Sequence, residues 1–225
     1  MSKMYSASAV INKNNLAAAA LRQGHYRDAL VVMREATVTL NSIHRRSDIR
    51  TRYPVRPMDS FPPIQSSPVG PMHGHPAIES GSSAMFRRAI ILSQQEESVQ
   101  VISAVVLFNL ALCHHLIGTS LNSSGRICSA LQFYKMSYQI MEENRHLCIF
   151  GDLLVLALIN NIAEAWAQVC EVRKAREWFD FLSKILGVES DDQRSLPALD
   201  EEDYVFFYMN AMLHHGETMD IAPAA

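Results

Sequence analysis

The sequence predicts an all-α protein made of stacked antiparallel helix pairs. Three observations predict this fold class. First, Asn, a large aliphatic residue and Ala follow one another three times, at 15–17, 109–111 and 161–163. Second, another alanine follows the first after twelve residues in two copies and after nineteen in the other, and a large residue follows four positions later. Third, the hydrophobic content is 48%, enough for a row of helix pairs to share one core.

The small residues explain why each copy should fold as a helix pair. Alanines on facing helices let two backbones approach closely, and larger residues one turn away fill the groove between them. Gly24 and Gly118 each fall seven residues after the first alanine, where we expect the first helix of the pair to end. A left-handed backbone at that point is cheap only for glycine. In the third copy Cys170 takes this place.

The first and second copies are separated by an unusual segment. Residues 45–85 hold seven of the nine prolines, three glycines and seven serines. This composition is typical of a disordered surface loop rather than a packed helix. The expected organisation is therefore a first helix pair over 1–44, a disordered insertion over 45–85, and the second and third pairs with a C-terminal helix over 86–225.

Two further stretches flank the last pairs. MFRRAIIL (85–92) is a short apolar run that fits strand or helix by periodicity and could lie extended across the helices. Ser93 and Glu96 form a capping-box pattern that predicts the start of the next long helix. Near the end, LDEEDYVFFYMNAMLHHG predicts a capping helix, with Asp200 as its N-cap.

The repeated pattern resembles the tetratricopeptide repeat. The tract FNLALCHHLIG (108–118) is also similar to one in diatom proteins with divergent repeats of this kind, for which no function carries over. The resemblance implies a solenoid in which the first helix of each pair lines a concave groove. The residues that carry it are Leu16, Ala17, Gly24, Tyr26, Ala29 and Ala36, then Leu110, Ala111, Gly118, Ala130, Tyr134 and Ser137, then Ile162, Ala163, Trp166, Ala175 and Phe179.

The strongest candidate site is a row of asparagines. Asn15, Asn109 and Asn161 occupy one structural position, two residues before the close-packed alanine of each copy. An amide side chain carries both a donor and an acceptor, so a row of them can bind the backbone of an extended peptide. Peptide-binding members of the family, such as the kinesin light chains, have Asn at the matching place and use it this way. The alternative is that each Asn simply bonds a neighbouring helix or repeat.

Four other residues are expected to shape the groove. Phe108 and Leu112 would make its middle apolar, although both are also ordinary core candidates. Arg22 supplies a positive charge that Glu164 opposes. A carboxylate clamp of the chaperone-binding type, which needs several Lys and Arg residues on this face, is therefore not supported.

Catalytic and metal sites find little support in the sequence. The paired histidines are His114 with His115 and His214 with His215. Neighbours on a helix point about 100° apart, so neither pair suits one metal ion. Nucleophile and phosphate-loop motifs are missing. We therefore expect no enzyme, no metal and no cofactor.

The choice of partner and compartment is also limited. The net charge of −3 gives no overall basic field for nucleic acid, but HRRSDIRTRYPVR (44–56) carries five arginines and could bind phosphates. The N-terminus has no secretory pattern, and the apolar run Leu153–Ile159 is too short to span a bilayer. We expect an intracellular protein, cytoplasmic or nuclear, without membrane contact.

The sequence thus predicts a non-catalytic module that binds a peptide or helix of a protein partner in a concave groove. The first alternative is a self-associating structural subunit whose groove is filled by its own chain, either MFRRAIIL or the C-terminal helix. It could dimerise through the apolar stripe Tyr204, Phe207 and Ala211. Nucleic-acid binding through residues 44–56 is the weaker alternative.

Overall fold

A computed structural model describes residues 2–48, 84–96, 98–144, 151–188 and 199–215. This part of the chain is all-helical, with seven helices and no strand. The insertion predicted at 45–85 lies almost entirely outside it. The helices are α1 (Ser2–Arg22), α2 (Tyr26–Asp48), α3 (Val99–Ser120), α4 (Ser124–Glu143), α5 (Gly151–Gln168), α6 (Val172–Leu186) and α7 (Glu201–His215).

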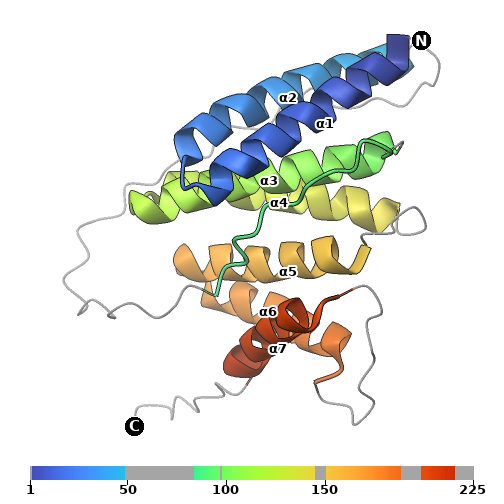
Figure 1. Ribbon diagram of the computed structural model, residues 1–225. Helices are drawn as coiled ribbons and strands as arrows, with labels where there is room; N and C mark the ends of the chain where they lie inside the picture. The colour runs from blue at the N-terminus through green and yellow to red at the C-terminus, as the bar shows by residue number, and fades with distance from the viewer. Residues whose placement is uncertain (1, 49–83, 97, 145–150, 189–198, 216–225) are drawn as a thin grey trace, which may run out of the picture.

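The helices pack in chain order. Each of α1, α3 and α5 contacts the helix that follows it, and the three pairs lie one below another in Figure 1, with α7 against α6 and α5 at the lower end. One continuous hydrophobic core runs through all of them. Because each pair has a neighbour on its apolar face, no pair has to bury that face alone.

The predicted small residues lie between the helices. Ala17, Ala111 and Ala163 are completely buried, as are Ala29 and Ala130 on the second helices of their pairs. Their short side chains permit the close helix contacts that the sequence predicted.

Helix α3 is the central helix of this core. Every residue from Val101 to Gly118 is buried, which fits a helix that is apolar on all sides. It is also the one helix in the described part of the chain that is long and apolar enough to cross a membrane, but the whole of its apolar window lies inside the fold.

The turns within the pairs differ from one another. Gly24 (φ +79°) and Cys170 (φ +63°) are both left-handed, and they follow α1 and α5 as expected. The prediction for Gly118 was wrong, because α3 continues to Ser120. A Cβ at residue 118 would lie 2.9 Å from Cγ1 of Ile127 and 3.1 Å from its backbone nitrogen, so this glycine lets α4 approach closely.

Residues 84–92 are extended and form no helix. Figure 1 shows them as a thin green trace that crosses the stack from α5 to the start of α3. The predicted helix start at Ser93 was wrong: α3 begins at Val99, and its N-cap Ser98 accepts a hydrogen bond from the Val101 N–H. The prediction for Asp200 is confirmed, since its carboxylate accepts from the Asp203 N–H at 2.8 Å.

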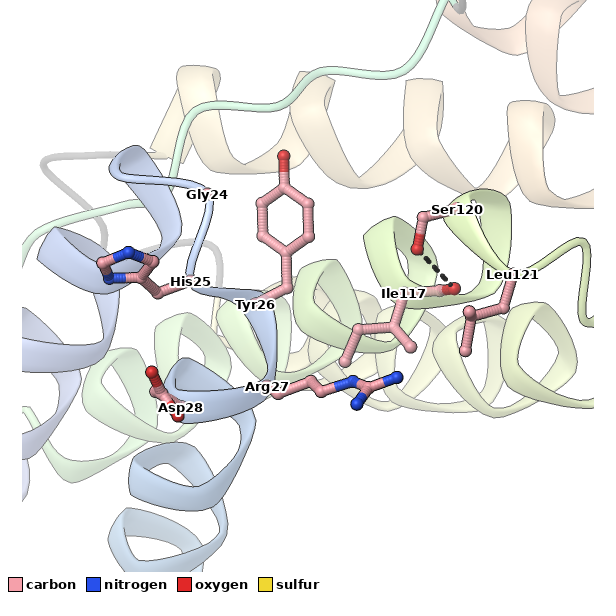
Figure 2. Close-up of a pocket in the computed structure, with 8 residues that line it drawn as sticks. All are labelled: Gly24, His25, Tyr26, Arg27, Asp28, Ile117, Ser120 and Leu121. Atoms are coloured by element: carbon pink, nitrogen blue, oxygen red, sulfur yellow. Dashed lines mark hydrogen bonds between the residues drawn. The ribbon is translucent and has the colours of Figure 1, made fainter.

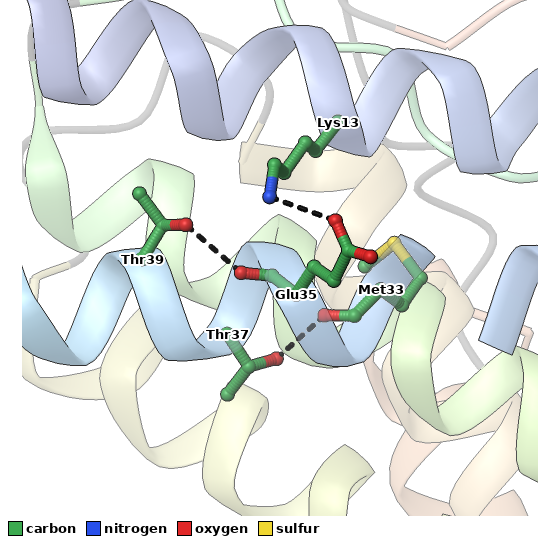
Figure 3. Close-up of polar contacts among 5 residues, drawn as sticks. All are labelled: Lys13, Met33, Glu35, Thr37 and Thr39. Carbon is green, nitrogen blue, oxygen red and sulfur yellow. Dashed lines mark hydrogen bonds and ion pairs between the residues drawn. The ribbon is translucent and has the colours of Figure 1, made fainter. Parts of the chain in front are cut away.

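The first pair also has polar contacts that join only its own two helices or successive turns of one helix. Lys13 of α1 forms an ion pair with Glu35 of α2 at 2.9 Å, and both side chains are partly exposed. Thr37 and Thr39 donate hydrogen bonds to the carbonyl oxygens of Met33 and Glu35, one helical turn earlier (Figure 3). These bonds are local and hold no distant segment.

Candidate functional site

The central feature of the described structure is a ladder of three asparagines that hold the backbone of residues 84–92. Asn15 of α1 accepts from the Leu92 N–H at 2.9 Å and donates to the Leu92 carbonyl at 2.8 Å. Asn109 of α3 makes the same pair of bonds with Ile90, at 3.0 and 2.7 Å. Asn161 of α5 makes them with Phe86, at 2.7 and 2.9 Å.

The geometry of an extended chain explains these double bonds. In a strand, the N–H and C=O of one residue point to the same side, and residues two apart share that side. One amide side chain can therefore replace a neighbouring strand at a single residue. The three residues bound in this way, the rungs of the ladder, are 86, 90 and 92. They differ by even numbers, so they lie on the same side of the extended chain. The segment runs from α5 towards α1, opposite to the chain order of the pairs.

Three more asparagines extend the ladder. Asn14 donates to the Ile90 carbonyl at 3.1 Å and accepts from Asn109 at 2.9 Å. Asn160 and Asn210 both donate to the Ala84 carbonyl, at 2.7 and 2.9 Å. These hydrogen bonds were not predicted from the sequence, although Asn14 and Asn160 each stand directly before a predicted rung. Asn210 gave no such signal because α7 carries no copy of the repeated pattern.

Side chains of the segment fill the space between the helices. Met85, Phe86, Ile90 and Leu92 are all less than a tenth exposed. The Phe86 ring packs against Phe206 and Phe207 of α7, with centroid separations of 5.8 and 5.2 Å. This burial makes these four side chains part of the hydrophobic core.

One charged contact joins the segment to α7. The Arg88 guanidinium donates a short hydrogen bond to the Asp203 carboxylate and lies 3.8 Å from Asp200. The Asp203 side chain is only 5% exposed, whereas that of Arg88 is 56% exposed. Burial raises the pKa of Asp203 above its ordinary value, and the charge of Arg88 acts in the opposite direction.

A buried polar network continues from the ladder towards α4. The Asn161 amide donates to the Tyr134 hydroxyl at 3.2 Å, and that hydroxyl lies 3.5 Å from Nδ1 of His115. Nε2 of His115 lies 3.2 Å from the Gln168 side-chain oxygen. Burial lowers the pKa of His115 to about 4, so the ring is neutral near pH 7, and burial raises the pKa of Tyr134. The network is therefore uncharged under ordinary conditions.

The other predicted groove residues do not gather around the segment as one set. Phe108 and Leu112 are completely buried, which fits the alternative that they are ordinary core residues. Phe108 packs on Tyr134 at 5.7 Å between centroids. Arg22 is exposed at the end of α1, and Glu164 accepts a hydrogen bond from Gln168 at 2.9 Å.

The apolar stripe expected on α7 also needs correction. Phe207 and Ala211 are completely buried, and Tyr204 is half-buried, so this stripe faces the core. The exposed apolar residues of α7 are Val205, Met209, Met212 and Leu213. Both faces of α7 are rich in apolar residues, so the sequence alone does not show which of them is exposed.

The surface of the described residues has shallow hollows. One, of about 360 Å³, is open and lies at the turn of the first pair (Figure 2). It is lined by Gly24, His25, Tyr26, Arg27, Asp28, Ile117, Ser120 and Leu121. Another, of about 290 Å³, lies beside the segment between Arg88 and Phe206. Among the described residues, no group of three or more His, Cys, Asp or Glu side chains is placed to hold a metal ion.

Comparisons of the chain with protein-family models, with curated proteins and with solved structures found no match.

Proposed function

We propose that this chain is a non-catalytic protein-interaction module of tetratricopeptide-like stacked helix pairs. Its groove holds extended polypeptide by the backbone, and in this structure the polypeptide is the chain's own segment 84–92. The observation that supports the proposal is the ladder. Three side chains from three successive pairs each make two hydrogen bonds to one residue of the segment.

The chemistry of these bonds favours binding over catalysis. On the segment, the amides bind only backbone N–H and C=O groups, which every residue except proline presents. They therefore position a chain without selecting its sequence. Each bond contributes about 0.5–1.5 kcal/mol net, so most of the affinity has to come from buried apolar side chains such as Phe86 and Ile90.

Self-association is a second candidate function with an observation of its own. The outer face of α7 exposes Val205, Met209, Met212 and Leu213, which recur at helical spacing. If the groove is filled by its own chain, this exposed apolar face of α7 can still bind a second subunit. Light scattering on the wild-type chain and on a Met209→Lys, Leu213→Lys variant tests it: a dimer that becomes a monomer supports the candidate.

The main experiment compares three full-length proteins: wild type, the triple variant Asn15→Ala, Asn109→Ala, Asn161→Ala, and the control Asn41→Ala. Asn41 is exposed on α2, far from the segment in sequence. Hydrogen exchange followed by mass spectrometry reports how tightly residues 84–92 are held. Affinity capture from lysate on the same proteins reports which partners are bound.

The expected result is faster exchange in residues 84–92 of the triple variant, with helical content retained and captured partners changed. The Asn41→Ala protein should match wild type in both readouts. Unchanged exchange of the segment in the triple variant would show that the asparagines do not hold its backbone, and the proposed function would then be wrong.

A further inference from the structure

The contacts of segment 84–92 describe the ligand that the groove accepts. We propose that the groove exchanges this segment for an extended peptide of a partner protein with the same side-chain pattern. That pattern places large apolar residues at the first, fifth and seventh positions and a basic residue at the third, as Phe86, Ile90, Leu92 and Arg88 do. The inference rests on the proposed function, because it requires the asparagines to hold a peptide backbone.

The segment is held through its backbone. Its described backbone bonds are made by asparagine side chains rather than by a helix or a sheet. A second peptide of the same conformation would offer the same N–H and C=O groups to the same six side chains. Replacing the segment therefore breaks no hydrogen bond within a helix.

Selectivity comes from the side chains of the segment. Phe86 is 3% exposed and packs on two phenylalanine rings, while Ile90 and Leu92 are 8% and 2% exposed. A competing peptide needs side chains of similar size at these places to avoid leaving cavities. Asp203 is nearly buried and faces Arg88, so a peptide without a positive charge at the third position would leave this carboxylate unpaired.

The segment competes with any free peptide because it belongs to the same chain. Residues 49–83 connect the segment to α2, and residues 93–98 connect it to α3, so the segment stays close to the groove after release. Such tethering corresponds to an effective concentration on the order of 1 mM. A free peptide with identical contacts at about 10 μM would then occupy only about one groove in a hundred. A partner peptide must bind better than the segment, or the segment must be weakened.

The test uses a fluorescent peptide, SAMFRRAIILS, which copies residues 83–93. It is added to the full-length wild type and to a full-length Phe86→Ala, Ile90→Ala variant whose own segment is weakened by more than about a hundredfold. Fluorescence anisotropy should show little binding to wild type at 10 μM and saturable binding to the variant. A peptide with Glu in place of Arg88, and a peptide with Ala in place of Phe86 and Ile90, should each bind at least about tenfold more weakly.

Two outcomes would overturn the inference. One is that the folded variant does not bind the peptide, or binds all three peptides equally. The other is a wild-type dimer that the peptide dissociates, which would make a second copy of this chain the source of the exchanged segment. Hydrogen exchange in residues 84–92 that depends on the asparagines, together with no peptide binding, would separate the two proposals. The asparagine ladder and the proposed function would be supported, and only the replacement of the segment by a peptide would be wrong.

A second measurement covers the case in which the variant does not fold. Hydrogen exchange on wild type should show the Phe86, Ile90 and Leu92 amides exchanging at least about a hundredfold faster than the core amides of α3. That result means that the segment opens while the helices stay folded, as replacement requires. Equal exchange rates would mean that the segment leaves only when the whole protein unfolds, which contradicts the inference.

Discussion

The two sides of helix α1 use polar side chains in very different ways. On the outer side, Lys13 reaches Glu35 through an ion pair in which both side chains contact water. Two residues later, the half-buried Asn15 makes two hydrogen bonds to Leu92, which is 77 positions away in the chain. The neutral amide does more for the fold because its partners are removed from water and would be left without hydrogen bonds if it were lost.

The largest expected effect is at a completely buried rung, Asn109. Asn109→Ala removes both bonds to Ile90 and the bond to Asn14, and leaves the Ile90 N–H buried without its partner. We expect the free energy of unfolding to fall by about 2–4 kcal/mol. Urea denaturation measures it, with Asn41→Ala as the control, expected to change stability by less than about 0.5 kcal/mol. A loss of stability as small as that of the control would mean that the ladder asparagines stabilise the fold no more than exposed polar residues do.

The rung on α1 should matter less than the rung on α3. Asn15 is only half-buried, so water can replace part of what Asn15→Ala removes from Leu92. We expect a loss of about 1–2 kcal/mol in the same urea experiment. If Asn15→Ala proved as costly as Asn109→Ala, burial would not be what sets the value of a rung.

The charged contact should show a pH signature. Arg88→Met removes the positive charge that faces Asp203, whose pKa burial already raises. A raised pKa in the folded state means that protonation of Asp203 favours folding, and the Arg88 charge stabilises only the ionised carboxylate. We therefore expect the variant's deficit in the free energy of unfolding, about 1 kcal/mol at pH 7, to shrink as the pH falls through that pKa. Thermal unfolding of wild type and variant between pH 7 and pH 4 measures this. A deficit that grows towards acid pH would contradict the assignment.

The smallest effect is expected on the outer side of α1. Lys13→Met removes an ion pair between partly exposed side chains, which we expect to contribute about 0.5 kcal/mol or less and to weaken with salt. Urea denaturation at low and high salt measures it. A loss above about 1 kcal/mol would show that this surface contact rivals the asparagine ladder.

Much of the fold could be predicted from the sequence because it rests on local rules. The alanine spacing predicted the close helix pairs, Gly24 predicted the end of α1, and Asp200 predicted the start of α7. The prediction for Gly118 was wrong because a glycine can either end a helix or allow another helix to approach closely. Only the position of Ile127 shows which role this glycine has.

The candidate site could be predicted only in part. The sequence singled out Asn15, Asn109 and Asn161, because a residue that recurs at one place in three copies is visible without a structure. It did not identify Asn210, which belongs to none of the copies, nor the pairing of Arg88 with Asp203 across 115 positions. Such contacts depend on how the helices stack, and no local pattern records that.

The sequence by itself determined that the chain is helical, where its pairs lie, and which amides could bind a backbone. Only the tertiary structure decided what they bind, because residues 85–92 fit a strand or a helix equally well by periodicity. Stacking three pairs lines up their asparagines, and the extended segment presents to them backbone groups that lie outside any helix, together with apolar side chains. The same stacking decided which face of α7 reaches the core and which stays exposed.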